Sequence, residues 1–213
     1  AGGLATIGNV GAGTAGAVTI TQSQAGVIFS NTVDATTISL TDTADGQTIQ
    51  FQGNVNATAL ATATEGYNVT ITNDVSFAAM TGNLTFGNSF DDIATFNGGL
   101  DTTSVAGTVN LAGTVRSTND QIDIGAATLA NATVIDTQAT TTDGDLNLGQ
   151  ITGGGNQLTL RTGNGVANAD IDASGDITNV TTLTLENVGG AATLSGDVDV
   201  TTLSVNNTNL NVV

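Results

Sequence analysis

The sequence predicts an all-β fold, a parallel β-helix (β-solenoid) with coils of about 20–22 residues. Two observations predict it: short segments of alternating apolar and polar residues recur along the 213-residue chain, and a longer unit repeats at a nearly constant offset. The composition agrees, because Thr, Asn, Gly and Val favour strands and turns over helices. No charge block or Pro-rich linker divides the chain, so we expect one solenoid domain over residues 1–213.

The repeating unit begins with a large apolar residue and continues through a strand. Phe29–Ile38 and Phe51–Leu60 match position by position at an offset of 22 (51 − 29). Phe96–Val105 and Leu194–Leu203 fit the same frame. Repetition at such a period is typical of solenoids, in which each unit contacts only its neighbours.

Each unit changes its alternation at the same place. Val33 and Ala35 have one parity, whereas Ile38 and Leu40 have the other. Because alternate strand residues point to opposite faces, this slip lets the chain turn a corner with its apolar side chains still inside. We expect a second corner at the glycines of the units, where a positive φ is often required; these are Gly53, Gly98, Gly113 and Gly196.

Hairpin-type dipeptides leave a Greek-key sandwich open as an alternative. Asn-Gly and Asp-Gly are the strongest signals for two-residue hairpin turns. They occur at Asp45-Gly46, Asn97-Gly98, Asp143-Gly144 and Asn164-Gly165. The internal repeat favours the solenoid over the sandwich.

The charge balance excludes several classes of partner. Arg116 and Arg161 are the only basic residues against 19 Asp and Glu, so the net charge is −17. Nucleic acids are excluded because phosphate binding needs Lys and Arg, and anionic membranes are disfavoured for the same reason. No apolar run approaches the ~18 residues that suggest membrane insertion. The chain has no Cys, which excludes disulfides and thiol chemistry.

One acidic segment suggests a metal. Asp170-Ile-Asp172-Ala-Ser174-Gly-Asp176 is similar to the opening of a calcium loop, although the twelfth position holds Thr181 instead of Glu. Ile171 is expected to point inward, so Asp170 and Asp172 would share the outer face. Asp170, Asp172 and Asp176 are therefore candidate calcium ligands, and a solvated strand edge is the alternative. Calcium is the one cofactor that the sequence suggests.

The motifs tested for catalysis do not support an enzyme. The glycines of Gly11–Gly16 match a dinucleotide fingerprint, but a strand-like segment follows where the fingerprint needs a helix. Asp91-Asp92 resembles the carboxylate pair of β-helical polysaccharide hydrolases, yet adjacent strand residues point to opposite faces. Without His, Cys or Lys, triads, zinc sites and P-loops are excluded. We expect no catalytic or cofactor-binding residue.

A ladder of polar residues is expected on the outside of the coils. Asp34, Asn56, Asp101 and Asp199 each follow the inward Val or Leu of a unit. If the units stack, these side chains would form a column of carboxylates and amides.

The repeats resemble those of bacterial secreted exoproteins of the filamentous-haemagglutinin and autotransporter-passenger kind. The resemblance lies in Phe51–Leu60, Asp145–Leu160 and Ser195–Leu203, and a weaker one exists to surface-layer proteins. It implies a right-handed parallel β-helix, export through an outer membrane, and a role in adhesion or biofilms.

These observations predict a structural or adhesive segment, a stalk or adhesin module, at the bacterial cell surface. The alternative is a self-assembling subunit of an extracellular filament or surface layer that stacks end to end. Other surface proteins and a host or matrix surface are further possible partners. A β-helix that binds or cleaves carbohydrate is the remote alternative, since Tyr67 is the only Tyr and Trp is absent.

Overall fold

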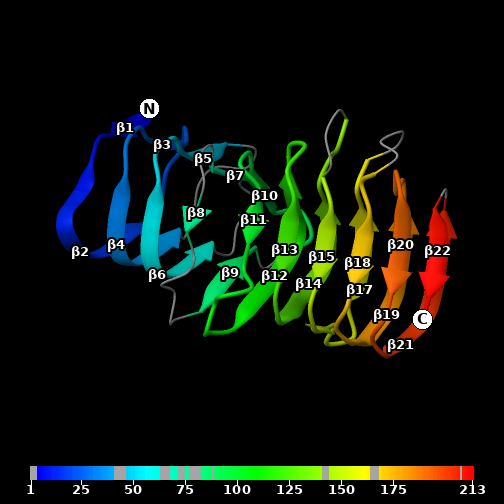
Figure 1. Cartoon of the computed structure of the whole chain (residues 1–213). Coiled ribbons are helices and arrows are strands. Elements are labelled where there is room, and N and C mark those ends of the chain that lie inside the picture. Colours follow the sequence, from blue (N-terminus) through cyan, green and yellow to red (C-terminus); the bar gives the residue numbers. More distant parts are fainter. Residues whose placement is uncertain are drawn as a thin grey trace.

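The fold is a parallel β-solenoid, as the repeats predicted. A computed structural model describes residues 4–40, 47–62, 68–71, 75–76, 83–87, 89–140, 144–163, 168–206 and 208–213. Every strand pair in these residues is parallel, and successive coils stack side by side from the N-terminal to the C-terminal end (Figure 1). The same residues contain no helix long and apolar enough to cross a membrane.

The strands are short, and several bend around a corner. In the first part of the chain they are β1 (Ala5–Ile7), β2 (Val10–Ile20), β3 (Val27–Phe29), β4 (Val33–Leu40), β5 (Thr48–Phe51), β6 (Val55–Thr62), β7 (Asn68–Ile71), β8 (Val75–Ser76), β9 (Leu84–Phe86), β10 (Ile93–Phe96) and β11 (Leu100–Asp101). In the second part they are β12 (Val109–Ser117), β13 (Ile122–Ile124), β14 (Ala127–Asp136), β15 (Leu146–Leu148), β16 (Ile151–Thr152), β17 (Gln157–Arg161), β18 (Ile171–Ala173), β19 (Ile177–Glu186), β20 (Ala191–Leu194), β21 (Val198–Asn206) and β22 (Asn209–Val212).

Each coil has three faces. Face 1 is one ladder of β1, β3, β5, β7, β10, the second parts of β12 and β14, β17, and the second parts of β19 and β21. Face 2 holds the first parts of β2, β4 and β6, then β8, and continues as β11, β13, β15, β18, β20 and β22. Face 3 holds the second parts of β2, β4 and β6, then β9, the first parts of β12 and β14, β16, and the first parts of β19 and β21.

The parity slip marks a corner, as expected. In β4 the side chains of Val33 and Ala35 are buried on face 2 and those of Ile38 and Leu40 on face 3, with two exposed threonines between them. β4 pairs with β6 in the register of the sequence repeat, Val33 opposite Val55 and Ile38 opposite Leu60. The register and the corner of this unit are therefore both confirmed.

The corner that the strands bend around changes along the molecule. β4 and β6 run continuously from face 2 to face 3, whereas β12, β14 and β19 run from face 3 to face 1. The Leu194–Leu203 unit was therefore aligned one face out of phase. Leu194 lies on face 2 in β20, and Phe29, its supposed equivalent, lies on face 1 in β3. Both kinds of corner need the same slip, so the pattern alone does not distinguish them.

The coils differ in length because the loops between faces differ. Val27 pairs with Ile49 at an offset of 22 (49 − 27), within the expected range. The offset falls to 18 between Val109 and Ala127 and rises to 26 between Ile151 and Ile177. The strands keep their positions in each coil because the apolar interior requires it, and the loops absorb the difference.

The interior is a continuous column of aliphatic side chains with a few aromatic rings. Phe29 and Phe51 are fully buried and stack with their ring centroids 4.7 Å apart. The rings of Phe86 and Phe96 pack edge to face, with their centroids 4.9 Å apart. Parallel stacking in register places like side chains over one another, which favours close packing of the interior.

Buried hydroxyls close the loops of the C-terminal coils. Ser117, Thr137 and Thr162 lie one above the other where face 1 ends, and all three are fully buried. Thr137 Oγ1 lies 2.6 Å from the carbonyl of Gly144, and Thr162 Oγ1 lies 2.8 Å from the carbonyl of Ala169. Each of these two hydroxyls thus ties a loop carbonyl to the end of face 1.

The prediction of a positive φ at the glycines of the repeating units is only partly correct. Gly113 does have a positive φ of 68°. Gly53, Gly98 and Gly196 do not, but a Cβ at Gly196 would lie 2.4 Å from the carbonyl oxygen of Gly175 in the preceding coil. Close approach of the neighbouring coil, and not backbone handedness, excludes a side chain there.

The sandwich alternative is wrong, since it requires antiparallel strands and all described pairs are parallel. Asn97-Gly98 makes the turn between β10 and β11, which lie on different faces. Asp45-Gly46 and Asn164-Gly165 lie outside the described residues, as do Asp143 and Tyr67.

Candidate functional site

Both arginines of the chain belong to one ladder of alternating charge on face 1. Arg116 pairs in register with Asp136, and Asp136 with Arg161. Arg161 lies beside Glu186, because Leu160 pairs with Leu185 in the adjacent strand. We call Arg116, Asp136, Arg161 and Glu186 the charge ladder. Opposite charges at neighbouring positions of paired strands stabilise the pairing.

Direct contacts join Arg161 to Glu186 within the charge ladder. Arg161 and Glu186 form an ion pair, and Arg161 Nε donates to Glu186 Oε1 at 2.6 Å. Arg116 Nε donates to Thr95 Oγ1 at 3.0 Å, which extends the contact to the preceding coil. Next to Asp136 and Arg161 lies a shallow hollow of about 420 Å³, also lined by Gln138, Ala139, Thr140, Gly163 and Asn187.

The pKa of Asp136, within the charge ladder, is raised. Burial raises the pKa of its carboxyl above the ordinary value of 3.8. The Gln138 amide, which donates to Asp136 Oδ1 at 2.8 Å, and the guanidinium groups of Arg161 and Arg116 oppose this shift without cancelling it. Desolvation of the carboxylate therefore outweighs its attraction to the two arginines.

Asp136 is expected to stabilise the fold more at acidic than at neutral pH. Its pKa is higher in the folded than in the unfolded chain, so between the two values the folded state binds more protons. The free energy of unfolding contributed by Asp136 is then fully present below pH 3.8 and falls as the pH rises through the raised pKa. Urea unfolding of the wild type and Asp136→Asn across this range measures it. The free energy of unfolding of the wild type minus that of Asp136→Asn is expected to fall as the pH rises, because Asn is neutral at every pH; a value that rises instead would contradict the shift.

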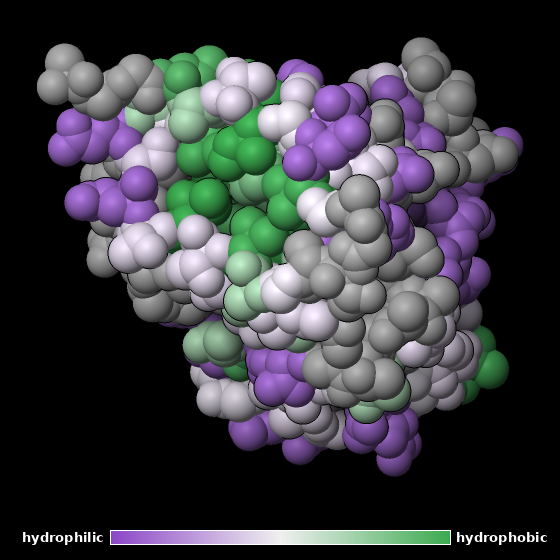
Figure 2. All heavy atoms as spheres, turned by 90° about the vertical axis from the view of Figure 1, so that its left-hand side faces the viewer, coloured by the Kyte–Doolittle hydropathy of each residue, from purple (hydrophilic) through white to green (hydrophobic). Residues whose placement is uncertain are grey.

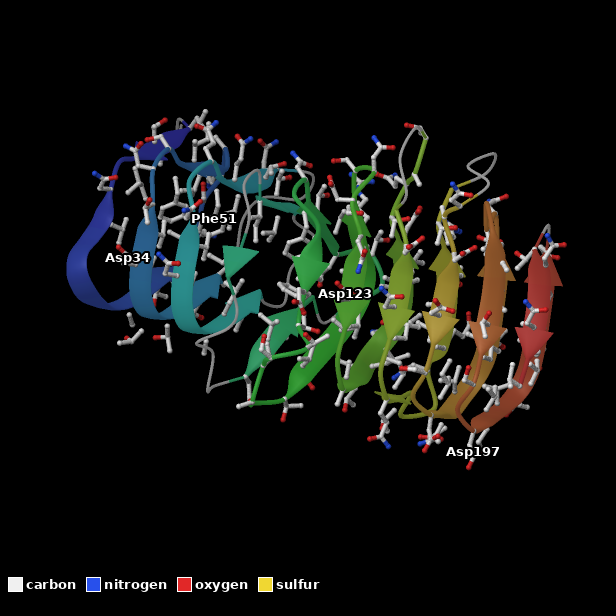
Figure 3. All side chains as sticks on the ribbon, viewed as in Figure 1. Asp34, Phe51, Asp123 and Asp197 are labelled. Atoms are coloured by element: carbon white, nitrogen blue, oxygen red, sulfur yellow. The ribbon has the colours of Figure 1, made fainter. Side chains whose placement is uncertain are left out.

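A second ladder, made of Asp and Asn side chains, runs along the outside of face 2. Asn56 Nδ2 donates to Asp34 Oδ1 at 2.6 Å, and Asn147 Nδ2 donates to Asp123 Oδ1 at 2.7 Å. Asp101 pairs in register with Asp123. Asp34 and Asp123 point outward on the same side of the solenoid (Figure 3). The expected column of Asp34, Asn56 and Asp101 is thus found on one face.

Asp199 does not belong to this column. It follows Val198, which pairs with Ile177 on face 3, and not with a strand of face 2. The error has the same cause as the misaligned Leu194–Leu203 unit, because the strand that carries Asp199 turns at a different corner. Asp172 takes a place in the column instead, in register with Asn147.

The three candidate calcium ligands, Asp170, Asp172 and Asp176, do not form one cluster. Asp170 Oδ1 accepts from the backbone amide of Ala191 at 2.6 Å, and Asp176 Oδ1 accepts from that of Asp197 at 2.9 Å. Asp172 is exposed on face 2. Among the described residues, no three Asp, Glu, His or Cys side chains lie together in a group that could hold a metal ion.

Asp170 and Asp176 accept hydrogen bonds from backbone amides at the corners, and Asp145 does the same. Asp145 Oδ1 accepts from the amide of Asp170 at 3.0 Å, in the same way that Asp170 accepts from Ala191 one coil later. A corner interrupts the backbone ladder and leaves amides that need an acceptor. Carboxylates supply strong acceptors for such amides.

The two motifs tested for catalysis lie in a strand and beside a turn. Gly11–Gly16 lies within strand β2, so no helix follows the glycines. Asp91 is exposed and Asp92 is buried, with Asp92 Oδ2 accepting from the amide of Ser89 at 3.0 Å. The two adjacent carboxylates thus face different surroundings.

The apolar interior is open at the C-terminal end. Leu203 and Val205 in β21 are 41% and 39% exposed, although they occupy the inward positions of face 1. Their partners one coil earlier, Leu183 and Leu185, are completely buried. Strand β21 covers the earlier pair, whereas no described strand follows β21 on face 1.

The N-terminal end is open in the same way. Ile7 and Val10 are only partly buried, whereas their partners Phe29 and Val33 are completely buried. A hollow of about 470 Å³ lies at this end, lined by Ala5, Ile7, Thr19, Ile20, Thr21, Gln22, Ser23, Gln24 and Val27. Viewed end-on, apolar residues are seen in the middle of this surface with polar residues around them (Figure 2).

Sequence reasoning missed the charge ladder, but a signal for it exists. An apolar residue precedes each charged residue, as in Val115-Arg116, Ile135-Asp136, Leu160-Arg161 and Leu185-Glu186. The spacings are unequal, which hides the pattern from a search at a fixed period. No protein-family model, curated protein or solved structure matches the chain.

Proposed function

We propose that this chain is a structural rod, a stalk or adhesin segment of a bacterial extracellular surface protein. The observation that carries the proposal is the continuity of face 1, which forms one ladder of paired strands from β1 to β21. Each added coil lengthens such a ladder by about 4.8 Å. A solenoid of this kind separates what is attached to its two ends by a set distance.

The outer surface is consistent with exposure outside the cell. Its net charge of −17 keeps neighbouring molecules apart, and the absence of Lys leaves trypsin-like proteases only two cleavage sites. The backbone amides at the corners have acceptors in Asp145, Asp170 and Asp176. Such bonds oppose the local opening that proteolysis requires.

Labelling of intact source cells tests the proposal. An antibody raised against the folded chain is expected to bind cells that have not been permeabilised, whereas an antibody against a cytosolic protein of the same cells does not. Labelling that appears only after permeabilisation would contradict a surface role. Specific binding in a glycan array would favour the carbohydrate-binding alternative instead.

A further inference from the structure

We infer that Asn97 is a site of spontaneous chemical modification, at which the backbone nitrogen of Gly98 displaces the side-chain amide of Asn97. The reaction is deamidation through a cyclic imide, and it needs no enzyme, metal or cofactor. Three features of the turn between β10 and β11 lead to the inference: the identity of the two residues, the state of the Gly98 amide and the surroundings of the Asn97 side chain.

The amino-acid sequence narrows the candidate asparagines to two. The nitrogen that attacks an asparagine belongs to the next residue, and it is least crowded when that residue has no side chain. Only Asn97 and Asn164 precede a glycine. Asn164 lies outside the described residues, so the structure bears on Asn97. Asparagines on the strands, such as Asn110 and Asn147, precede a buried leucine instead.

The turn is closed by backbone hydrogen bonds on either side of the Gly98 amide. The Asn97 amide donates to the carbonyl oxygen of Ile71 at 2.9 Å, and the Gly99 amide donates to that of Phe96 at 3.4 Å. Within the described part of the chain the Gly98 amide makes no hydrogen bond, and Gly98 is exposed. Water therefore reaches this nitrogen and can remove its proton, which prepares it for attack.

The side chain of Asn97 offers the group that is attacked. Thr118 Oγ1 donates to Asn97 Oδ1 at 3.3 Å. A donor at this oxygen stabilises the negative charge that develops on it when Cγ is attacked. Because the nitrogen and Cγ belong to adjacent residues, the attack is intramolecular and benefits from proximity.

The reaction consumes water and releases ammonia. The Gly98 nitrogen forms a bond to Asn97 Cγ, the bond between Cγ and Nδ2 breaks, and Nδ2 leaves as ammonia with the proton that the Gly98 amide has lost. Water then opens the imide ring at either carbonyl, which gives an aspartyl or an isoaspartyl residue. No group is oxidised or reduced. Each conversion adds one negative charge to the net charge of −17, so the molecule becomes more acidic with age.

The scarcity of basic residues makes the site easy to map. Trypsin cleaves after Arg116 and Arg161 and divides the chain into three peptides, residues 1–116, 117–161 and 162–213. Asn97 lies in the first peptide and Asn164 in the third, so the two Asn-Gly pairs are measured separately.

Mass spectrometry of the folded chain, incubated at mildly alkaline pH and then digested, tests the inference. Relative to a sample that was not incubated, the first peptide is expected to gain the mass difference between an amide and a carboxyl group. Fragmentation of the peptide is expected to localise this gain to Asn97. The second peptide contains Asn147 and no Asn-Gly pair, and it is expected to remain unchanged over the same period.

Two variants assign the mass gain to attack by the Gly98 nitrogen. Gly98 is exposed and has no positive φ, so the turn accepts Gly98→Ala. The added Cβ crowds the nitrogen and is expected to slow the gain about tenfold, which corresponds to about 1.4 kcal/mol on the barrier. Asn97→Gln moves the carbonyl carbon one methylene farther away and is expected to abolish the gain. Circular dichroism confirms that both variants are folded.

The chain unfolded in urea provides the reference for the effect of the fold. If Asn97 is converted in urea but stays intact in the folded chain over the same period, the turn protects the side chain and the inference is wrong. A mass gain at Asn97 that Gly98→Ala does not slow would also overturn it, because the attacking nitrogen would then not be that of Gly98.

Discussion

Replacement of Phe51 by alanine is expected to lower the free energy of unfolding by about 3–5 kcal/mol. The ring is completely buried and stacks on that of Phe29, with centroids 4.7 Å apart. Truncation removes the transfer energy of the ring and leaves a cavity between two coils. Strand ladders on both sides hold the backbone, so the cavity cannot collapse. Urea unfolding monitored by circular dichroism measures the loss.

Phe90 provides a matched control for this prediction. It is the same residue type but is 72% exposed. Phe90→Ala is expected to change the free energy of unfolding by no more than about 0.5 kcal/mol. Equal losses for Phe51→Ala and Phe90→Ala would show that Phe51 does not lie in a packed interior.

Thr137→Val is expected to cost about 1–3 kcal/mol of the free energy of unfolding. Valine has nearly the same shape, so the packing is retained while the hydroxyl is lost. Thr137 Oγ1 lies 2.6 Å from the carbonyl oxygen of Gly144 and 3.2 Å from that of Thr162. Both carbonyls lie in a buried environment, where the lost hydrogen bond is not replaced by water.

Two further variants distinguish the hydroxyl from the packing. Thr137→Ser keeps the hydroxyl and is expected to be less destabilised than Thr137→Val. Thr159→Val makes the same substitution on the outside of β17 and is expected to have little effect. If Thr137→Val were as stable as the wild type, or Thr137→Ser were the less stable of the two, the hydroxyl would not be what closes the loop.

The fold class could be predicted because the solenoid repeats its physical requirements in every coil. Each coil must present apolar side chains inward at strand spacing and must slip its parity to turn a corner. Both requirements leave a pattern in a short stretch of sequence, as between Val33 and Leu40. The unit that begins at Phe29 therefore gave the register with the unit at Phe51 directly.

The functional surfaces were predicted less completely, for a physical reason. The column to which an outward side chain belongs depends on how coils of different length are aligned. Arg116 and Asp136 are adjacent across a short coil, and Asp136 and Arg161 across a longer one. The sequence shows the charges, and only the aligned strands show that they alternate.

At the corners, too, the sequence alone does not show which groups the acidic side chains contact. A run of Asp170, Asp172 and Asp176 is typical of a calcium loop when read alone. In the structure Asp170 and Asp176 each accept from a backbone amide of the following coil, and Asp172 lies on face 2. The partners of the first two are 21 residues away, so the local sequence carries no sign of them.

The amino-acid sequence by itself determined the all-β class, the stacked coils and the inward set of apolar residues, because burial acts on each strand through its own alternation of residues. The tertiary structure alone decided which corner each strand turns and which charges stand side by side. These depend on the stacking of one coil on the next. Loops of unequal length set that stacking, and the alternation within a strand does not encode it.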